Sequence, residues 1–600
     1  MRKLNFWLIV CVSLVFASTV QAQNISVSIA PTTANLLVTA QQAFTATVTN
    51  DPANSGVTWS VLPASGTLCT GAGCGTASPT STASGSSTTY EAPPAPSGGT
   101  IMVTATSVTD PTKSASATVT LTAGVNNASL SGDYAFSFSG TSASGSFTFA
   151  GVGRFTADGA GNVTNGEVDI NASQSAGPNV TQEAFTGTYA IGADNRGVMT
   201  WDIPGTLSSS PKQRFAKITF AMMANGNAVL SAFDAFGGKT ELASGTMEKA
   251  DTSAYNAARI TGDYAFGVSG LDHSNNRVAF AGRLTANGAG SFSNATADIN
   301  SSGTINSAMF TMATYSLSDS LTGRGAIRLT ALLGAMPRTF NFVFYVVNAG
   351  KLFVMDSDPY TISAPLLSGS VLHQQVPAGG FSNASLNGGM VIYLTGRSVC
   401  AGTAPAPHVL AGLLNAATGT FTLNYDQNCG GSSSFGSETG TYAAASNGRL
   451  CLTVGTADTV IYLVDNSNEA FVLGTDGSVL FGFGEPQAAG PLTNSSVKGT
   501  YAGFTSSISM FDSFSGEFTA DGASPGNITG AEDVINPNGP NSGAAFNATY
   551  SVSASPTNGR GTMTLTSPNG GGAALYVIST SKFVVIPLTD PNPAIQIFAQ

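Results

Sequence analysis

Oxygen-bearing side chains recur in a Gly-rich phrase of this 600-residue chain and could bind a metal ion. In RFTADGAGNVTNGEVDIN, Asp158 and Asn162 lie close together and Asp169 follows. A dedicated calcium loop, however, needs several carboxylates at close alternate spacing. Later copies carry Asn287, Asn415 and Asp521 in place of Asp158, and the last copy is longer. Because a ligand set would not tolerate that drift, the phrase does not predict a metal site.

The same phrase predicts a tight hairpin turn. Asp-Gly and Asn-Gly supply the positive φ angles that short hairpins require. The recurring turn residues are Asp158 with Gly159, Asn287 with Gly288, and Asp521 with Gly522. We assign them to a structural repeat motif.

Paired carboxylates are the other candidates for chemistry. Glu167 with Asp169, or Glu532 with Asp533, could serve as the acid pair of a glycoside hydrolase. They sit beside the repeated turn, so we interpret them as solvated acids at strand ends. The chain has three histidines and no shared histidine site, nucleophile elbow, zinc spacing or phosphate loop. We therefore expect no catalytic, metal-binding or cofactor-binding residues.

The recurring phrases mark four copies of one repeat. Its opening phrase is LSGDYAFSFSG from Leu130, ITGDYAFGVSG from Ile260 and VKGTYAGFTSS from Val497, with a weaker form from Leu386. The expected copies span residues 128–250, 258–376, 381–488 and 492–600; the third is the most diverged and contains cysteines. The opening phrases add Tyr134, Tyr264 and Tyr501 to the structural repeat motif.

Each repeat is expected to fold as an up-and-down β-barrel. The first copy divides into about eight alternating segments joined mostly by short turns, so neighbouring strands are antiparallel. Closing eight such strands removes exposed edges and leaves a filled core or room for one small ligand. A propeller is the alternative, but the repeats have no half-repeat period. A transmembrane barrel is disfavoured by Thr and Ser on both faces of the strands.

Alternate connections of such a barrel share a rim. The short, repeated turns that follow the second, fourth and sixth strands lie at one rim, and the longer, dissimilar connections, such as NASQSAGPNVTQE, lie at the other. Four arginines each open a strand directly after one of the short turns: Arg196, Arg324, Arg449 and Arg560. We interpret them as caps over the closed end, packed on aromatic rings or bonded to turn carbonyls; a binding role is the alternative.

The N-terminus is typical of an exported protein. Residues 1–22 combine Arg2 and Lys3 with a short apolar run and a small residue at Ala22, which predicts a signal peptide. The run is too short for a membrane anchor, and no later stretch could span a membrane as a helix. Disulfides form in exported proteins. We expect a Cys69–Cys74 bond around a Gly-rich loop and favour Cys400–Cys429, which leaves Cys451 as a buried thiol.

Residues 23–124 predict a separate β-sandwich, because several short alternating strands are divided by Gly, Pro and Asn turns. The segments TWSV, TTYEAPPAP, IMVTATS and SASATVTL resemble the bacterial Ig-like domains of surface proteins and adhesins. This resemblance implies that Trp59 is the core tryptophan and that the domain acts as a stalk or spacer. The repeats resemble lipocalin-like and avidin-like barrels in shape, and uncharacterised secreted proteins of environmental bacteria, which implies no activity.

Composition narrows the function. Only 9% of residues are charged and the formal net charge is -11, which argues against nucleic acid and against an anionic lipid surface. We expect a non-enzymatic protein that is secreted, at the cell surface or periplasmic, with an adhesion, structural or surface-binding role, whose partner is a glycan or a protein. The alternative is a multivalent binder of small ligands or glycans through the variable rim of each barrel. A secreted hydrolase ranks last.

Overall fold

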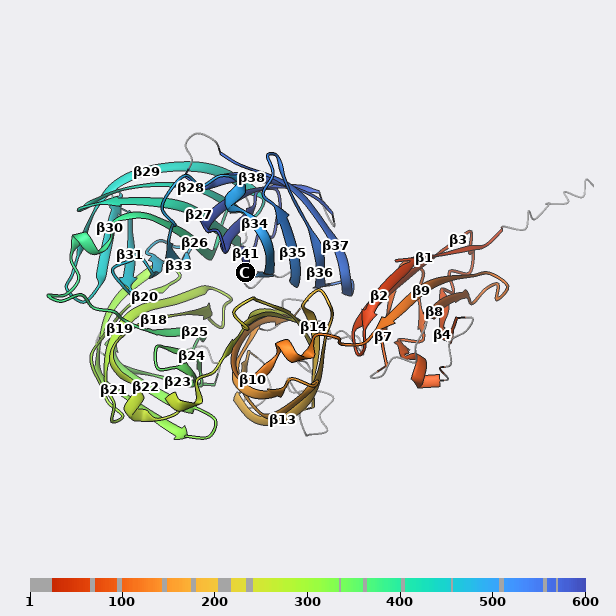
Figure 1. Cartoon of the computed structure of the whole chain (residues 1–600), viewed down its shortest axis with the longest axis horizontal. Helices are drawn as coiled ribbons and strands as arrows, with labels where there is room; N and C mark the ends of the chain where they lie inside the picture. Colours follow the sequence, from red (N-terminus) through yellow and green to blue (C-terminus); the bar gives the residue numbers. More distant parts are fainter. Residues whose placement is uncertain are drawn as a thin grey trace, which may run out of the picture.

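The computed structural model describes residues 24–600 apart from residues 65–68, 70, 94–99, 143–147, 174–179, 203–216, 234–240, 334–335, 360–363, 401–404, 455–456, 507–511, 554–557 and 568–569. The predicted signal peptide and residues 174–179 of the NASQSAGPNVTQE connection lie outside the described residues. The fold is all-β, with an N-terminal pair of sheets followed by four closed barrels, as predicted from the sequence. Figure 1 shows the barrels grouped around a common centre, with the N-terminal domain at one side.

The N-terminal domain packs two sheets around one core. The four-stranded sheet has the order β1-β3-β7-β5 and the five-stranded sheet the order β2-β9-β8-β4-β6. Their strands are β1 (Ser26–Ala30), β2 (Thr33–Leu37), β3 (Gln41–Thr49), β4 (Val57–Pro63), β5 (Thr76–Ser78), β6 (Ser81–Thr82), β7 (Ser87–Glu91), β8 (Thr100–Ser107) and β9 (Ser114–Thr122), with a 3-10 helix η1 (Gly71–Cys74). Trp59 is buried in the shared core and donates its Nε1–H to Thr82.

The barrels are simple meanders of eight antiparallel strands each. Barrel 1 is β10 (Ser131–Ser142), β11 (Thr148–Asp158), β12 (Asn162–Ala172), β13 (Val180–Ile191), β14 (Arg196–Asp202), β15 (Lys217–Met222), β16 (Ala228–Ala232) and β17 (Glu241–Lys249). Barrel 2 is β18 (Thr261–Leu271), β19 (Arg277–Asn287), β20 (Phe292–Ser301), β21 (Thr304–Asp319), β22 (Arg324–Leu333), β23 (Met336–Asn348), β24 (Lys351–Asp356) and β25 (Leu366–His373).

Barrel 3 is β26 (Gly388–Ser398), β27 (Ala406–Ala417), β28 (Thr420–Cys429), β29 (Ser432–Ala444), β30 (Arg449–Val454), β31 (Ala457–Leu463), β32 (Ala470–Gly474) and β33 (Phe481–Pro486). Barrel 4 is β34 (Lys498–Thr505), β35 (Ser513–Asp521), β36 (Gly526–Asn536), β37 (Gly539–Val552), β38 (Arg560–Ser567), β39 (Gly571–Ser579), β40 (Lys582–Pro587) and β41 (Gln596–Ala599). The first and last strands pair in every barrel, which closes it and contradicts the propeller alternative.

Each barrel interior is filled by its own apolar cluster. In barrel 1 this core is largely aromatic: Tyr134 stacks on Phe155 with ring centroids 5.5 Å apart, and Phe185 stacks on Trp201 at 4.8 Å. Burying rings of this size supplies much of the stability of a small barrel. The interiors are therefore packed cores, and room for a ligand must be sought at the rims and between the barrels.

A short 3-10 helix leads into the first strand of each barrel and closes its short-turn rim. These helices are η2 (Asn127–Ser129), η5 (Ala257–Arg259), η6 (Asn383–Ser385) and η7 (Asn494–Ser496); η4 (Thr252–Ala254) precedes η5. A fourth-strand tyrosine donates to the carbonyl that follows the helix: Tyr189 to Leu130, Tyr315 to Ile260, Tyr442 to Leu386 and Tyr550 to Val497. This role of the four tyrosines was not expected from the sequence, although TYA or TYS recurs in all four copies.

The outer walls of neighbouring barrels are apolar where they meet. Barrel 1 contributes Ala135, Ala150 and Val152 to a cluster with Val343 and Met355 of barrel 2. Larger clusters join barrels 2 and 3 and barrels 3 and 4. At each junction the first strands of one barrel face the sixth and seventh strands of the next. Barrel 4 meets barrel 1 in the same way, so the four barrels form a closed ring (Figure 1).

Candidate functional site: the junctions between the barrels

A buried ion pair joins barrel 1 to barrel 2. Asp169, near the end of β12, is only 2% exposed and accepts hydrogen bonds from Nε and Nη2 of Arg324 at 2.8 Å each. The hydroxyl of Tyr345, which lies opposite Arg324 on β23, donates to the same carboxylate at 2.8 Å. The hydrogen bonds to Asp169 raise the pKa of Arg324, and burial raises that of Tyr345. This Asp–Arg–Tyr group forms a charge-assisted clamp between two barrels.

The clamp recurs at the next two junctions. Its members are Asp298, Arg449 and Tyr462 between barrels 2 and 3, and Asp426, Arg560 and Tyr576 between barrels 3 and 4. Burial acts to raise the pKa of Asp298, but hydrogen bonds from Arg449, Ser307 and Tyr462 hold it below its ordinary value. The carboxylate of Asp298 therefore stays ionised at neutral pH.

The clamps correct two expectations. The arginines do not cap their own barrels, because three of them bind a carboxylate of the preceding barrel and Arg196 binds one of barrel 4. Asp169, Glu532 and Asp533 are not solvated, because each is at most 4% exposed. The sequence does carry a signal for these contacts. The repeated phrase ends in Asp-x-Asn, and the negative charge of that aspartate complements the positive charge of the recurring arginine.

The asparagine of that ending makes a second contact. Asn171, two residues after Asp169, is fully buried and donates its side-chain N–H groups to the carbonyls of Asp356 and Asp358 in barrel 2. The same pair of bonds runs from Asn300 to Gly474 and Asp476, and from Asn428 to Pro587 and Asp590. In each case the end of the third strand of one barrel is tied to the last residue of the seventh strand of the next and to the chain just after it.

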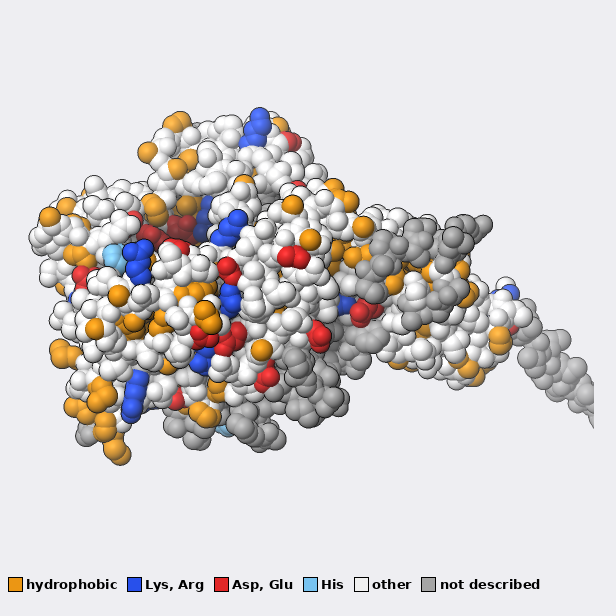
Figure 2. All heavy atoms as spheres, turned by 60° about the horizontal axis from the view of Figure 1, so that its bottom comes forward, with side chains coloured by type: hydrophobic (Ala, Val, Ile, Leu, Met, Phe, Trp, Pro, Cys, Tyr) orange, Lys and Arg blue, Asp and Glu red, His pale blue; other side chains and the backbone are white. Residues whose placement is uncertain are grey.

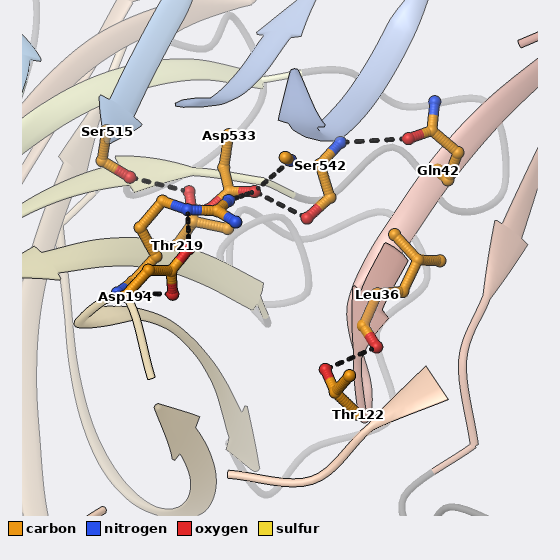
Figure 3. Close-up of polar contacts among 10 residues, drawn as sticks. Leu36, Gln42, Thr122, Asp194, Thr219, Ser515, Asp533 and Ser542 are labelled. Atoms are coloured by element: carbon orange, nitrogen blue, oxygen red, sulfur yellow. Dashed lines mark hydrogen bonds and ion pairs between the residues drawn. The ribbon is translucent and has the colours of Figure 1, made fainter. Parts of the chain in front are cut away.

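The junction between barrels 4 and 1 departs from this pattern. Arg196 binds Asp533 of barrel 4 at 2.8 Å and Asp194 of its own turn at 2.8 Å. Ala221 stands where the other junctions have tyrosine, and Ile535 stands where they have asparagine. Serine contacts replace part of the apolar packing: Ser513 is bonded to Ser231, and Ser515 is bonded to Thr219 (Figure 3 shows the second contact). Its apolar clusters hold three buried residues each, so this closing junction is the least apolar of the four.

Carboxyl groups crowd around Arg196 at the closing junction. Burial raises the pKa of Glu532 to about 8, and nearby Asp512 and Asp533 act in the same direction. Burial likewise raises the pKa of Glu517 to about 7. Both glutamates belong to barrel 4 and lie within the electrostatic reach of Arg196 of barrel 1. The closing junction is therefore the one whose charge state changes near neutral pH.

The N-terminal domain spans this closing junction. Gln42 of β3 accepts the backbone N–H of Ser542 in barrel 4 at 3.2 Å, while Glu91 of β7 pairs with Lys217 of barrel 1 at 2.9 Å (Figure 3 shows the first contact). Lys217 is 3% exposed and also donates to the carbonyl of Thr39 at 2.5 Å. A cavity of about 1050 Å³ lies between the three units. The domain thus holds barrels 1 and 4 together from outside the ring.

The turn residues of the repeat lie at the short-turn rims. Asp158 accepts the backbone N–H groups of Ala160 and Asn162 at 2.7 and 2.9 Å, and its hydrogen bonds, that of the Asn162 side chain foremost, lower its pKa to about 2. Gly159 has a φ of +75°. Asn287 and Asp521 make the same backbone contacts. Asn415 does not, because it lies within β27 and the third turn is built around Gly419.

The opening-phrase tyrosines anchor another short turn. Tyr134 donates to the carbonyl of Gly226, Tyr264 to that of Ala349 and Tyr501 to that of Thr580. Each acceptor belongs to the connection between the sixth and seventh strands. In the third copy the buried Met390 takes the place of the tyrosine.

Disulfides join Cys69 to Cys74 and Cys400 to Cys429. Cys451 lies on β30, outside both bonds, and is half-buried where the sequence suggested a buried thiol. Within the described residues no group of three or more His, Cys, Asp or Glu side chains could hold a metal ion. The part of the chain that the structure describes also contains no helix long and apolar enough to cross a membrane.

A cavity opens at the variable rim of barrel 2. Its volume is about 720 Å³, and its lining includes Phe280, Phe340, Met336, Arg338 and Asp356. The guanidinium of Arg338 lies 4.9 Å from the centre of the Phe340 ring. Aromatic faces beside polar groups are typical of small-molecule and sugar sites. Figure 2 shows one face of the molecule, on which acidic and basic side chains are few and scattered among uncharged ones.

No protein-family model matches the chain, and a comparison with curated proteins gives no match. Among solved structures, kievitone hydratase from Nectria haematococca is 8% identical over 58% of this chain and 91% of its own, with a TM-score of 0.13. The alcaligin outer membrane receptor FauA from Bordetella pertussis is 8% identical over 83% of this chain and 81% of its own, with a TM-score of 0.12. These scores are too low for either likeness to bear on fold or function.

Proposed function

We propose that the protein is exported and non-enzymatic, and that it binds a surface ligand, a glycan or a protein, through the variable rims of its four barrels. The predicted signal peptide and the two disulfides support export. The repeated charged residues form clamps between barrels, which supports a structural use of the residues that would otherwise be the best candidates for catalysis. The N-terminal domain, by its resemblance to bacterial Ig-like domains, would act as a spacer.

The observation that carries this proposal is the contact that Asn171 and its two equivalents make with the neighbouring barrel. Asn171 lies at the variable-rim end of β12, and the two carbonyls it binds lie at the variable-rim end of β24 and just after it. Because Asn300 and Asn428 make equivalent bonds, three of the four junctions hold the variable rims of neighbouring barrels side by side. A fixed array of rims would raise avidity for a repetitive surface even if each rim bound weakly. Loops that differ between copies are suited to recognition.

A second candidate is a small-ligand or glycan site in a single barrel mouth. The cavity of about 720 Å³ at the rim of barrel 2 favours it, since its volume falls in the range typical of ligand sites. In this form of the proposal Arg338 and Met336 contact the ligand directly, and the other barrels add avidity or spacing.

The test measures binding of the protein, as residues 23–600 carrying a fluorescent label, to a glycan array and to immobilised cell-surface proteins. Replacing Met336 and Arg338 together by alanine should weaken the apparent affinity at least about 10-fold, because a rim contact and its avidity are lost together. Leu321→Ala is the matched control, since Leu321 is 81% exposed on the opposite rim of the same barrel. Equal weakening by both variants, or no binding to either surface, would contradict the proposal.

A further inference from the structure

A cavity lies at the centre of the ring, where all four barrels meet. Its volume is about 540 Å³, and each barrel contributes to its wall. The apolar part of the wall comes from Phe138 of barrel 1, Phe353 of barrel 2, Phe481 of barrel 3, and Phe504 and Ile597 of barrel 4. An apolar cavity of this size with a few polar groups fits a small organic molecule. No single barrel contains this site, so only the closed ring creates it.

Arg277 is the unusual group in this wall. It opens β19 at the variable-rim end of barrel 2, and its Nη2 donates to Ser269 at 2.9 Å and to Thr395 of barrel 3 at 3.3 Å. Its Nε is buried and has no hydrogen-bond acceptor. No ion pair joins Arg277 to a carboxylate among the described residues, and the positive charge of Arg397 lies close enough to lower its pKa.

Placing the guanidinium of Arg277 here is energetically unfavourable unless an anion binds beside it. Burial, together with Arg397, lowers the pKa of Arg277 to about 10, so the guanidinium remains charged at neutral pH. Arg277 is half-buried, so its guanidinium is partly desolvated, which is unfavourable without a counter-ion. A carboxylate can bind guanidinium with two parallel hydrogen bonds. The hydroxyls of Ser269 and Thr395 lie beside it as further donors.

The opposite end of the cavity does not offer the same site. There Lys351 pairs with Glu248, and Lys582 pairs with Glu485, each at 2.6 Å. At the equivalent place in barrel 3 the chain has Glu469 instead of a lysine, and burial raises the pKa of that carboxyl group. Both lysines are therefore already neutralised, and an anionic head group is favoured only at the Arg277 end.

We infer that the central cavity binds an amphipathic monocarboxylate, with its carboxylate on Arg277 and its apolar body against Phe353, Phe481 and Phe504. The Arg277 end of this site lies near the variable rims, but its wall is formed between the barrels, and the inference does not depend on what the rims bind. Its ligand is recognised by one negative charge and an unbranched or flat apolar body. Barrels 2 and 3 together supply the head-group contacts, and all four barrels supply the wall.

Isothermal titration of residues 23–600 with dodecanoate tests the inference without any substitution. Dodecanoate should bind at one site per chain, and dodecanol, dodecyltrimethylammonium and acetate should each bind at least about 10-fold more weakly. Equal binding of the alcohol would remove the role of the charge. Tighter binding of the cation would assign the head group to Glu469. Inorganic sulfate or acetate binding as tightly as dodecanoate would remove the role of the apolar wall, and no binding of any probe would overturn the inference.

Substitutions then locate the head group. Arg277→Met keeps the length of the side chain and should weaken dodecanoate binding at least about 10-fold, whereas Arg277→Lys, which keeps the charge, should retain part of it. Arg328→Met on the outer wall of barrel 2 is the control, because Arg328 is exposed. If Arg277→Met folds with unchanged melting temperature and binds dodecanoate as the parent does, the assigned site is wrong.

Discussion

Replacing Arg324 by alanine is expected to lower the free energy of unfolding by about 3–5 kcal/mol, because the substitution leaves a buried carboxylate without its counter-ion. Asp169 is 2% exposed and would retain only the hydroxyl of Tyr345 as a partner in the clamp. Chemical denaturation of residues 23–600 measures the loss. Barrels 1 and 2 of the variant should separate at a lower denaturant concentration than in the parent, and both barrels should then unfold.

Arg328→Ala is the matched control for this prediction, since Arg328 lies on the same strand, β22, and is exposed. It should change stability by less than about 0.5 kcal/mol. A double-mutant cycle with Asp169→Asn should give a coupling of about 1–3 kcal/mol, because each partner's loss already removes the ion pair. If Arg324→Ala costs no more than Arg328→Ala, the clamp does not hold the barrels together.

The closing junction is expected to weaken as pH rises through neutrality. Glu532 has an ordinary pKa of 4.5 that burial raises to about 8, and that of Glu517 rises to about 7. An acid whose pKa is raised on folding stabilises the folded state fully below its unfolded pKa. This contribution to stability declines as pH rises and is lost once pH reaches the pKa of the group in the folded state. Stability should therefore fall between about pH 5 and pH 8, by roughly 4 kcal/mol from Glu532 alone, because one pKa unit corresponds to about 1.4 kcal/mol.

Glu532→Gln should remove most of this pH dependence, because glutamine resembles the neutral form of the acid. Thermal melting from pH 5 to pH 8.5 would show it as a flatter curve for the variant. Asp202→Asn is the control, since Asp202 is exposed at the end of β14, the strand that Arg196 opens. A variant that loses stability with pH as steeply as the parent would place the titrating groups elsewhere.

The barrels follow from local sequence features. Alternating segments, short joints and Asp-Gly or Asn-Gly turns predict eight antiparallel strands with two unlike rims, and the closed meander has that form. Asp158 with Gly159 illustrates why: the turn is built by contacts between residues a few positions apart. Contacts of this kind are visible as a sequence pattern within a single copy of the repeat. The fold class could thus be read without knowing how the repeats meet.

The junctions could not be read in the same way. Asp169 and Arg324 are far apart in the sequence, and either residue alone resembles an ordinary charged group beside a turn. Only the three-dimensional contact separates a clamp from a cap. The closing junction is harder still, because Ile535 and Ala221 break the pattern where the ring has to close. The site at Arg277 could not be predicted from the sequence, because the hydroxyls that it contacts, those of Ser269 and Thr395, come from two different barrels.

The central claim is that barrel 4 closes on barrel 1, and a designed disulfide tests it directly. The hydroxyls of Ser231 in barrel 1 and Ser513 in barrel 4 lie 2.6 Å apart in the closing junction. Replacing both by cysteine, in a Cys451→Ser background, should give a spontaneous bond detected by non-reducing peptide mapping. The control pairs Ser231→Cys with Thr500→Cys, because Thr500 is exposed elsewhere on barrel 4. A ring predicts near-complete bonding of positions 231 and 513 only; two reduced thiols there, as in the control, would show that the barrels form an open chain.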